Sequence, residues 1–146
     1  MDDEVDEVYR HSSALNHRVG SADAFYDGLQ PDGPAAQVID NDRAGISVSR
    51  TRFSAAAGQR VSYTLVLASE PAGDVVVDLA GSGGVQAFSN SCDDGEGGAS
   101  CAVFTAQNWD QPQTVTVLVQ GPGEIAHQVS SADGFYNGLA AKPVSV

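Results

Sequence analysis

The sequence predicts an all-β chain: a Greek-key antiparallel sandwich over residues 43–146, preceded by an orphan hairpin from a neighbouring copy of the same fold. Three observations support this prediction. Short stretches of alternating apolar and polar residues, separated by turn residues, recur from Ile46 onward. The chain contains 16 glycines and many Ser, Thr and Val residues, which favours strands and turns over helices. Finally, one block of thirteen residues occurs twice.

The repeated block defines the organisation of the chain. Residues 17–29 read HRVGSADAFYDGL, and residues 127–139, 110 positions later, read HQVSSADGFYNGL. A period of this length is too long for a solenoid unit and fits one whole small β-domain. Because the first block lies close to Met1, we expect the tail of one repeat in residues 1–42 and nearly all of the next repeat in residues 43–146.

The complete copy is expected to contain seven short strands. The clearest is the second, in which Val61, Tyr63, Leu65 and Leu67 alternate with Ser62, Thr64, Val66 and Ala68. Turn residues at 70–73 end it, and Pro112 precedes another alternating row. Seven such strands with turns between them are typical of a Greek-key sandwich. The expected strands are 46–49, 61–68, 75–79, 102–105, 114–120, 125–131 and 143–146.

The partial copy supplies only its last two strands. Residues 8–21 and 35–40 match the final strands of the complete copy through the repeat, so we expect them to pair as a hairpin. A hairpin without further strands is only marginally stable in water. The hairpin must therefore dock on another element or fray.

Charge separates the two parts of the chain. The net charge of the chain is −12, of which residues 1–42 contribute −8 and residues 43–146 contribute −4. No basic patch is present, so nucleic acid is not an expected partner. No apolar run is long enough to cross a bilayer, so membrane insertion is not expected either. An acidic surface suits a cation-rich setting, and a local acidic cluster could hold Ca²⁺; alternatively, the charge only keeps the protein soluble.

The two cysteines indicate a disulfide. Cys92 and Cys101 flank a Gly-rich segment, SCDDGEGGASC, which can fold back and bring the two thiols together. The spacing is neither that of a redox motif nor that of a metal site. Such bridges persist outside the reducing cytosol. The alternative is two free thiols in a cytosolic protein.

The sequence contains no motif of a known catalytic site, so an enzyme is not expected. His17 and His127 occupy equivalent positions in the two blocks, which favours a shared packing role over metal binding. Trp109 could offer a stacking surface to a glycan, although packing over a strand turn is the preferred interpretation.

Several segments together resemble the Calx-beta-type repeats of large bacterial surface proteins. They are AGISVSRTRF, YTLVLASEP, FTAQNWDQPQTVTV and SSADGFYNGL. The resemblance covers residues 40–146, and residues 1–39 match the end of the same repeat. The resemblance implies an immunoglobulin-like sandwich that occurs in tandem and binds Ca²⁺ at one end of the domain.

The resemblance also implies which residues would bind Ca²⁺. In the partial copy, the family's acidic loop and exit triplet correspond to Asp2, Asp3, Asp6, Asp40 and Asp42. The complete copy has Ala57 at the family's early Glu position, and its loop, GPGEIAH, holds a single carboxylate, Glu124. Any calcium binding is therefore expected in the N-terminal part and should be weak. A solvated acidic terminus is the alternative, and the carboxylates of Asp93, Asp94 and Glu96 form a less favoured second cluster.

Together these features predict a non-catalytic extracellular repeat, a spacer or adhesion unit of a larger surface or secreted protein, stiffened by Ca²⁺ between repeats. Its expected partners are neighbouring repeats of the same polypeptide and a cell-surface or glycan ligand. A ligand- or glycan-binding accessory module of an exported enzyme is the alternative.

Overall fold

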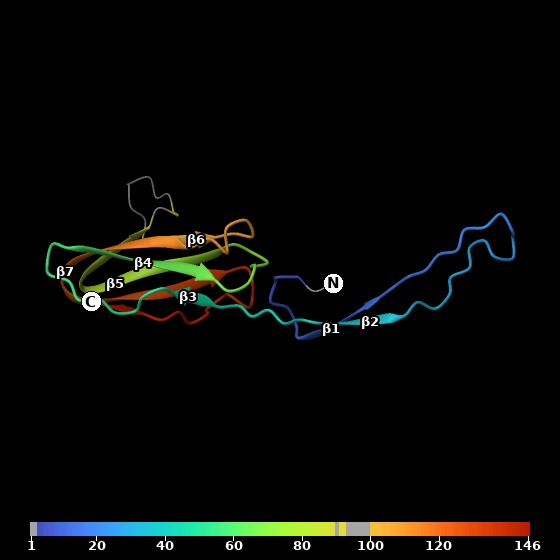
Figure 1. Ribbon diagram of the computed structural model, residues 1–146, viewed down its shortest axis with the longest axis horizontal. Coiled ribbons are helices and arrows are strands. Elements are labelled where there is room, and N and C mark those ends of the chain that lie inside the picture. Colours follow the sequence, from blue (N-terminus) through green and yellow to red (C-terminus); the bar gives the residue numbers. More distant parts are fainter. Residues whose placement is uncertain (1–2, 90, 93–99) are drawn as a thin grey trace. The chain divides into compact units, whose positions relative to one another are not determined.

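The structure is a computed structural model that describes residues 3–89, 91–92 and 100–146. The described residues form strands, turns and loops without any helix, as the sequence predicts. They divide into two compact units, which Figure 1 colours along the chain. Glu7–Asn41 make up most of the first unit, whereas Glu4–Asp6 and Asp42–Val146 form the second.

The first unit is built on a two-stranded hairpin. Strand β1 (Arg10–Ala14) pairs antiparallel with β2 (Ala35–Ile39), from Arg10 opposite Ile39 to Ala14 opposite Ala35. A backbone hydrogen bond from Asp40 N to Tyr9 O, 3.1 Å, extends the ladder at its open end. The two segments that the repeat predicted to pair therefore do so.

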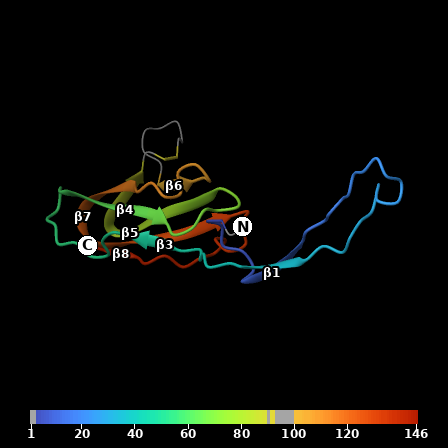
Figure 2. The same cartoon turned by 45° about the vertical axis from the view of Figure 1, so that its right-hand side comes forward.

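The second unit is a six-stranded antiparallel sheet folded into two layers (Figures 1 and 2). Its strands are β3 (Ile46–Val48), β4 (Arg60–Leu67), β5 (Val75–Ser89), β6 (Cys101–Phe104), β7 (Gln113–Ser131) and β8 (Val144–Ser145). One layer contains β3, β4, the first half of β7 and the end of β5. The other contains β6, the start of β5, the second half of β7 and β8.

Two long strands, β5 and β7, pass through both layers. Their pairing runs from Val75 opposite Ser131 to Gly83 opposite Gly123, and resumes with Val85 opposite Val119. At this shift, Gly84 alone stands opposite residues 120–122, which is a bulge. Both strands bend here, so a single sheet folds over on itself.

Glycine makes this corner possible. Gly83 has a φ of +67°, a conformation that residues with a Cβ rarely adopt. A Cβ added to Gly84 would lie 2.5 Å from the backbone nitrogen of Gly121, so β5 and β7 are too close here for any side chain at position 84. The bend therefore depends on two glycine-rich segments, GSGG at residues 81–84 and GPG at residues 121–123.

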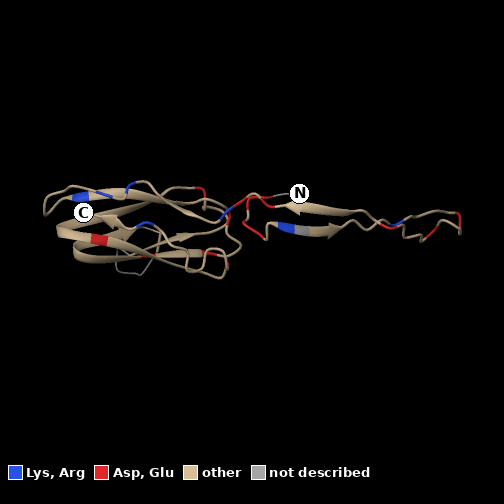
Figure 3. Ribbon diagram, turned by 90° about the horizontal axis from the view of Figure 1, so that it is seen from below, with Lys and Arg blue, Asp and Glu red and all other residues tan. Residues whose placement is uncertain are grey.

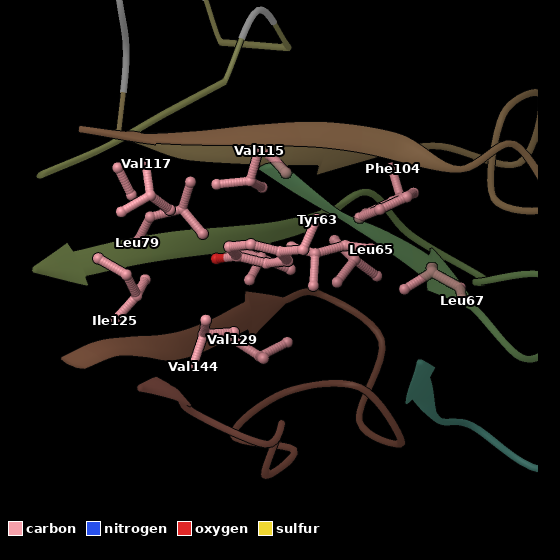
Figure 4. Close-up of a cluster of buried hydrophobic side chains, with 14 of the residues drawn as sticks. Tyr63, Leu65, Leu67, Leu79, Phe104, Val115, Val117, Ile125, Val129 and Val144 are labelled. Atoms are coloured by element: carbon pink, nitrogen blue, oxygen red, sulfur yellow. The ribbon is translucent and has the colours of Figure 1, made fainter. Parts of the chain in front are cut away.

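The core lies between the two layers. Alternate residues of β4, β5 and β7 point inward, as the period-two pattern predicts. Figure 4 shows their side chains meeting those from β6 and β8. The fully buried side chains include Leu65, Val75, Val77, Phe104, Val115, Val117, Ile125, Tyr136 and Val144.

The sequence did not predict how the strands join. The expected strands 114–120 and 125–131 are one continuous strand, β7, and the expected strand 75–79 extends to Ser89 in β5. The GPGEIAH segment, expected to be a loop, therefore lies inside β7. Glycines normally signal a loop, but here they let two paired strands bend at a bulge, and the ladder continues on both sides of it.

The two copies pair in the same register. Ala14 lies opposite Ala35 in the first unit, and Glu124 lies opposite Ser145 in the second, so both partners are shifted by 110 residues. The next pair, Ser13 and Ala36, corresponds to Gly123 and Val146, which exchange backbone hydrogen bonds of 3.0 and 3.2 Å. The hairpin of the first unit is thus the structural counterpart of β7–β8.

The two hairpins pair alike but differ in burial, so we predict that their backbone amides differ in protection from hydrogen exchange. We expect amides of β1 to exchange with solvent much faster than those of Ile125–Val129 in β7. The reason is that Ile125–Val129 pair with β5, meet β8 at Ile125 and are covered by the core, whereas β2 is the only strand that pairs with β1 among the described residues. Hydrogen exchange followed by NMR measures this difference, and equal protection of both segments in dilute protein would contradict it.

Candidate functional site

The second block, residues 127–139, builds a compact turn at the end of β7. The carbonyl of Asp133 accepts hydrogen bonds from Tyr136 N at 3.2 Å and Asn137 N at 2.9 Å, while its Oδ1 accepts from Phe135 N at 2.8 Å. Gly138, with a φ of +75°, closes the turn by donating to Val129 O at 3.0 Å. Asp133 therefore caps the turn as an N-cap residue caps a helix.

Three side chains of this turn hold the loop Ser69–Asp74. The hydroxyl of Tyr136 donates to Ser69 O at 2.7 Å and accepts from Ser69 N at 3.1 Å. Asp133 Oδ2 accepts from Ala72 N at 2.9 Å, and Ser131 Oγ donates to Asp74 O at 2.9 Å. We call these three residues, Ser131, Asp133 and Tyr136, the second clamp.

Burial strengthens the second clamp. Tyr136 is fully buried and Asp133 is 7% exposed, so their hydrogen bonds are shielded from water. Removing the Tyr136 hydroxyl would leave the buried backbone N–H and C=O of Ser69 without their partner. The second clamp therefore fixes the loop between β4 and β5 to the end of β7.

The first block forms the same turn. Asp23 O accepts from Tyr26 N and Asp27 N, both at 3.0 Å, and Asp23 Oδ1 accepts from Phe25 N at 3.0 Å. Gly28, with a φ of +81°, donates to Val19 O at 3.0 Å. Each of these bonds has its counterpart 110 residues later, so the block specifies its turn locally.

Exposure distinguishes the two blocks. Tyr26 is 59% exposed, whereas its counterpart Tyr136 is fully buried, and Phe25 is 89% exposed against 46% for Phe135. Leu15, the counterpart of the buried Ile125, is also exposed. The first block thus presents Ser21, Asp23 and Tyr26, which we call the first clamp, to solvent.

The second block also contains a buried histidine. Because the carbonyl of Lys142 can only accept, His127 Nδ1 donates to it at 2.8 Å, which leaves Nε2 to accept from the hydroxyl of Tyr63 at 2.8 Å. Burial lowers the pKa of His127, although the hydrogen bond to Lys142 O opposes this, and burial raises the pKa of Tyr63. The packing role expected for both histidines is confirmed for His127, which is buried, and is wrong for His17, which is exposed.

The predicted calcium ligands are divided between the two units. Asp6 Oδ2 accepts from Ala44 N at 2.6 Å within the second unit, and Asp40 Oδ2 accepts from Glu7 N at 2.8 Å within the first. Asp3 belongs to the first unit and Asp42 to the second, while Asp2 lies outside the described residues. No group of three acidic, His or Cys side chains among the described residues could hold a metal ion.

The acidic residues lie mostly outside the strands. The strands of the second unit carry only Asp78 and Glu124, so most of the red ribbon in Figure 3 follows loops and the acidic start of the chain. The less favoured acidic cluster, Asp93, Asp94 and Glu96, lies outside the described residues.

The predicted disulfide between Cys92 and Cys101 is present, with 5.8 Å between the two Cα atoms. Cys101 begins β6 and lies opposite Asp78 of β5, so the bridge is anchored to the sheet edge. A loop of this length contributes roughly 2–3 kcal/mol to stability in the chain-entropy model. The described residues include no apolar helix of bilayer-spanning length.

A shallow cleft of about 420 Å³ lies near the end of β6. Its lining among the described residues consists of Val103, Pro112 and polar side chains such as Ser91, Asn108 and Gln113, and includes no acid, base or histidine. Gln113 Nε2 donates to Val103 O at 2.5 Å, and its Oε1 accepts from Ser91 Oγ. Trp109 is half-buried and packs against the core, as its preferred interpretation predicted.

In comparisons with known proteins, no protein-family description matches the chain, and no curated protein matches it.

The second clamp yields a stability prediction. We expect Tyr136→Phe to lower the free energy of unfolding by about 1–3 kcal/mol, because the buried Ser69 N–H and C=O lose their partner. The matched change Tyr26→Phe should stay within about 0.5 kcal/mol, because Tyr26 is exposed. Urea denaturation followed by Trp109 fluorescence measures both, and equal losses would contradict the assignment.

The buried histidine yields a pH prediction. Because the pKa of His127 is lowered in the folded state, its stabilising contribution is complete above the unfolded value of 6.5 and is lost as pH falls below it toward the folded pKa. We therefore expect the free energy of unfolding to decline from pH 7.5 to pH 5, and His127→Gln to reduce that decline. Denaturation at several pH values tests this, with His17→Gln as control, and an unchanged pH profile for His127→Gln would refute it.

Proposed function

We propose that this chain is a non-catalytic repeat module of a larger exported protein, of the Calx-beta type, that acts as a spacer or adhesion unit. The observation that carries the proposal is the equivalence of the two copies: a hairpin in the same register, ending in the same turn, recurs after 110 residues. A chain that repeats its last strands in this way is suited to a tandem array, in which each unit folds alike and contacts its neighbours.

The buried titratable groups support a structural role. Tyr63 and His127 hydrogen-bond each other inside the core, and neither lines the cleft near β6. An acid or base for catalysis must reach a substrate in a pocket. We therefore assign these two groups to packing and the module to a non-catalytic class.

The disulfide and the charge support an extracellular setting. A bridge between Cys92 and Cys101 is stable outside the reducing cytosol. A net charge of −12 suits a cation-rich medium and disfavours anionic partners. We propose that the module's partners are neighbouring repeats of its own polypeptide and a ligand at a cell surface.

The calcium part of the proposal rests on the sequence. Asp2, Asp3, Asp6, Asp40 and Asp42 supply carboxylates on both sides of the hairpin in sequence, and Ca²⁺ requires six to eight oxygen ligands. By neutralising these carboxylates, Ca²⁺ would reduce their repulsion and limit movement between repeats.

Calcium titration tests this proposal. With a dissociation constant of about 1 mM, as in extracellular modules, 10 mM Ca²⁺ should stabilise the chain by about 1.4 kcal/mol. We expect Ca²⁺ to raise the melting temperature by about 5 °C, and the double change Asp40→Asn with Asp42→Asn to abolish that rise. The charge-matched control is Asp93→Asn with Asp94→Asn, which should keep it.

Two outcomes would contradict the proposed function. If the Asp40 and Asp42 variant responds to Ca²⁺ as the parent does, the assigned ligands are wrong. If the parent shows no response in melting, and small-angle X-ray scattering finds equal dimensions with and without Ca²⁺, calcium does not stiffen the module.

A further inference from the structure

We propose that the first clamp, Ser21, Asp23 and Tyr26, is a preformed binding surface for a strand-connecting loop in the earlier part of the repeat that residues 1–42 end. This inference rests on the proposed function, because it treats residues 1–42 as the end of one repeat and names the residues that would hold that repeat together. The occupant is a loop like Ser69–Asp74, together with the edge of a strand like the start of β5.

The geometry of the first clamp is already in place. Ser21 Oγ accepts from Asp23 N at 3.0 Å, as Ser131 Oγ accepts from Asp133 N at 3.0 Å in the second clamp. Both aspartates use Oδ1 for the amide two residues later, which in the second clamp directs Oδ2 to the bound loop. The first clamp therefore needs no rearrangement of its turn to bind such a loop.

The chemistry of the second clamp identifies the occupant. Tyr136, Asp133 and Ser131 bind only backbone groups within Ser69–Asp74, apart from one contact between the Tyr136 hydroxyl and Ser69 Oγ at 3.0 Å. A partner is thus recognised by the path of its backbone. The loop Ser69–Asp74 of this chain is already held by the second clamp, so it cannot serve the first.

Apolar side chains around the first clamp fit the same occupant. Leu15 and Tyr26 are exposed, whereas their counterparts Ile125 and Tyr136 are fully buried in the second unit. In the second unit, Ile125 lies opposite Gly81 of β5, and Val129 lies opposite Val77. A homologous strand beside β1 would bury the corresponding positions, Leu15 and Val19.

A graft tests whether the first block fits such a loop. Four changes, Gln128→Arg, Ser130→Gly, Gly134→Ala and Asn137→Asp, give the second block the sequence of the first. We expect the grafted chain to unfold at nearly the same urea concentration as the parent, and Tyr136→Phe to lower that midpoint equally in both. A grafted chain that fails to fold, or that is insensitive to Tyr136→Phe, would overturn the proposal.

A second measurement tests binding by the first clamp itself. A copy of residues 42–120, placed ahead of Met1 in the full chain, supplies a homologous loop and strand. We expect the amides of Tyr26, Gly28 and Leu29 to exchange at least tenfold more slowly than in the parent. In the extended chain Tyr26→Phe should reverse this slowing, whereas in the parent it should have no effect.

The remaining outcomes are informative. Unchanged exchange in the extended chain would overturn the proposal, even if the graft succeeds. Slowing that appears in the parent only at high protein concentration would assign the surface to a second copy, and would also overturn it. Neither result concerns calcium, so failure here is distinguishable from failure of the proposed function, which the calcium titration measures.

Discussion

The sandwich depends on one constraint: β5 and β7 must bend together without losing their pairing. The two strands share a ladder on both sides of the corner, so neither can bend alone. The two backbones approach so closely here that a Cβ on Gly84 would collide with the backbone of Gly121. Because the bend brings the two halves of one sheet face to face, the buried rows of β4, β5 and β7 form a core only if the corner forms.

Comparison of the two blocks distinguishes the hydrogen bonds that each block forms by itself from the burial that the rest of a domain provides. The Asp cap, the closing glycine and the backbone bonds are the same at Asp23 and at Asp133, although the surroundings differ. The burial of Tyr136 requires the loop Ser69–Asp74, which the first block lacks. The turn therefore forms from its own local hydrogen bonds, and the hydroxyl of Tyr136 then attaches it to the loop Ser69–Asp74. This division of roles suits a tandem array in which each unit must recognise the correct partner strands.

Periodicity and the repeat were sufficient to predict the fold class, the inward rows of β4 and β7, the pairing of the hairpin and the disulfide. Each follows from short-range information: alternation along a strand, a duplicated block, or two cysteines in one Gly-rich loop. The joining of strands could not be predicted, because Gly121 and Gly123 are equally compatible with a loop, and only the partner strand determines the outcome. The second clamp was missed for a similar reason. Ser131, Asp133 and Tyr136 signal a turn in sequence, but their bonds to Ser69–Asp74 span about 60 residues.

The most direct test of the central claim is the stability of single glycine variants at and away from the corner. Gly84→Ala should lower the free energy of unfolding by about 1–3 kcal/mol or more, because the new methyl group meets backbone atoms of Gly121. The matched control is Gly134→Ala, since a Cβ there meets no atom within 4 Å and the first block has Ala24 at the same position. That control should leave stability unchanged within about 0.5 kcal/mol. Urea denaturation that shows a large loss for Gly84→Ala alone is the predicted result, and equal stabilities of the two variants would contradict the dependence of the sandwich on its glycine corner.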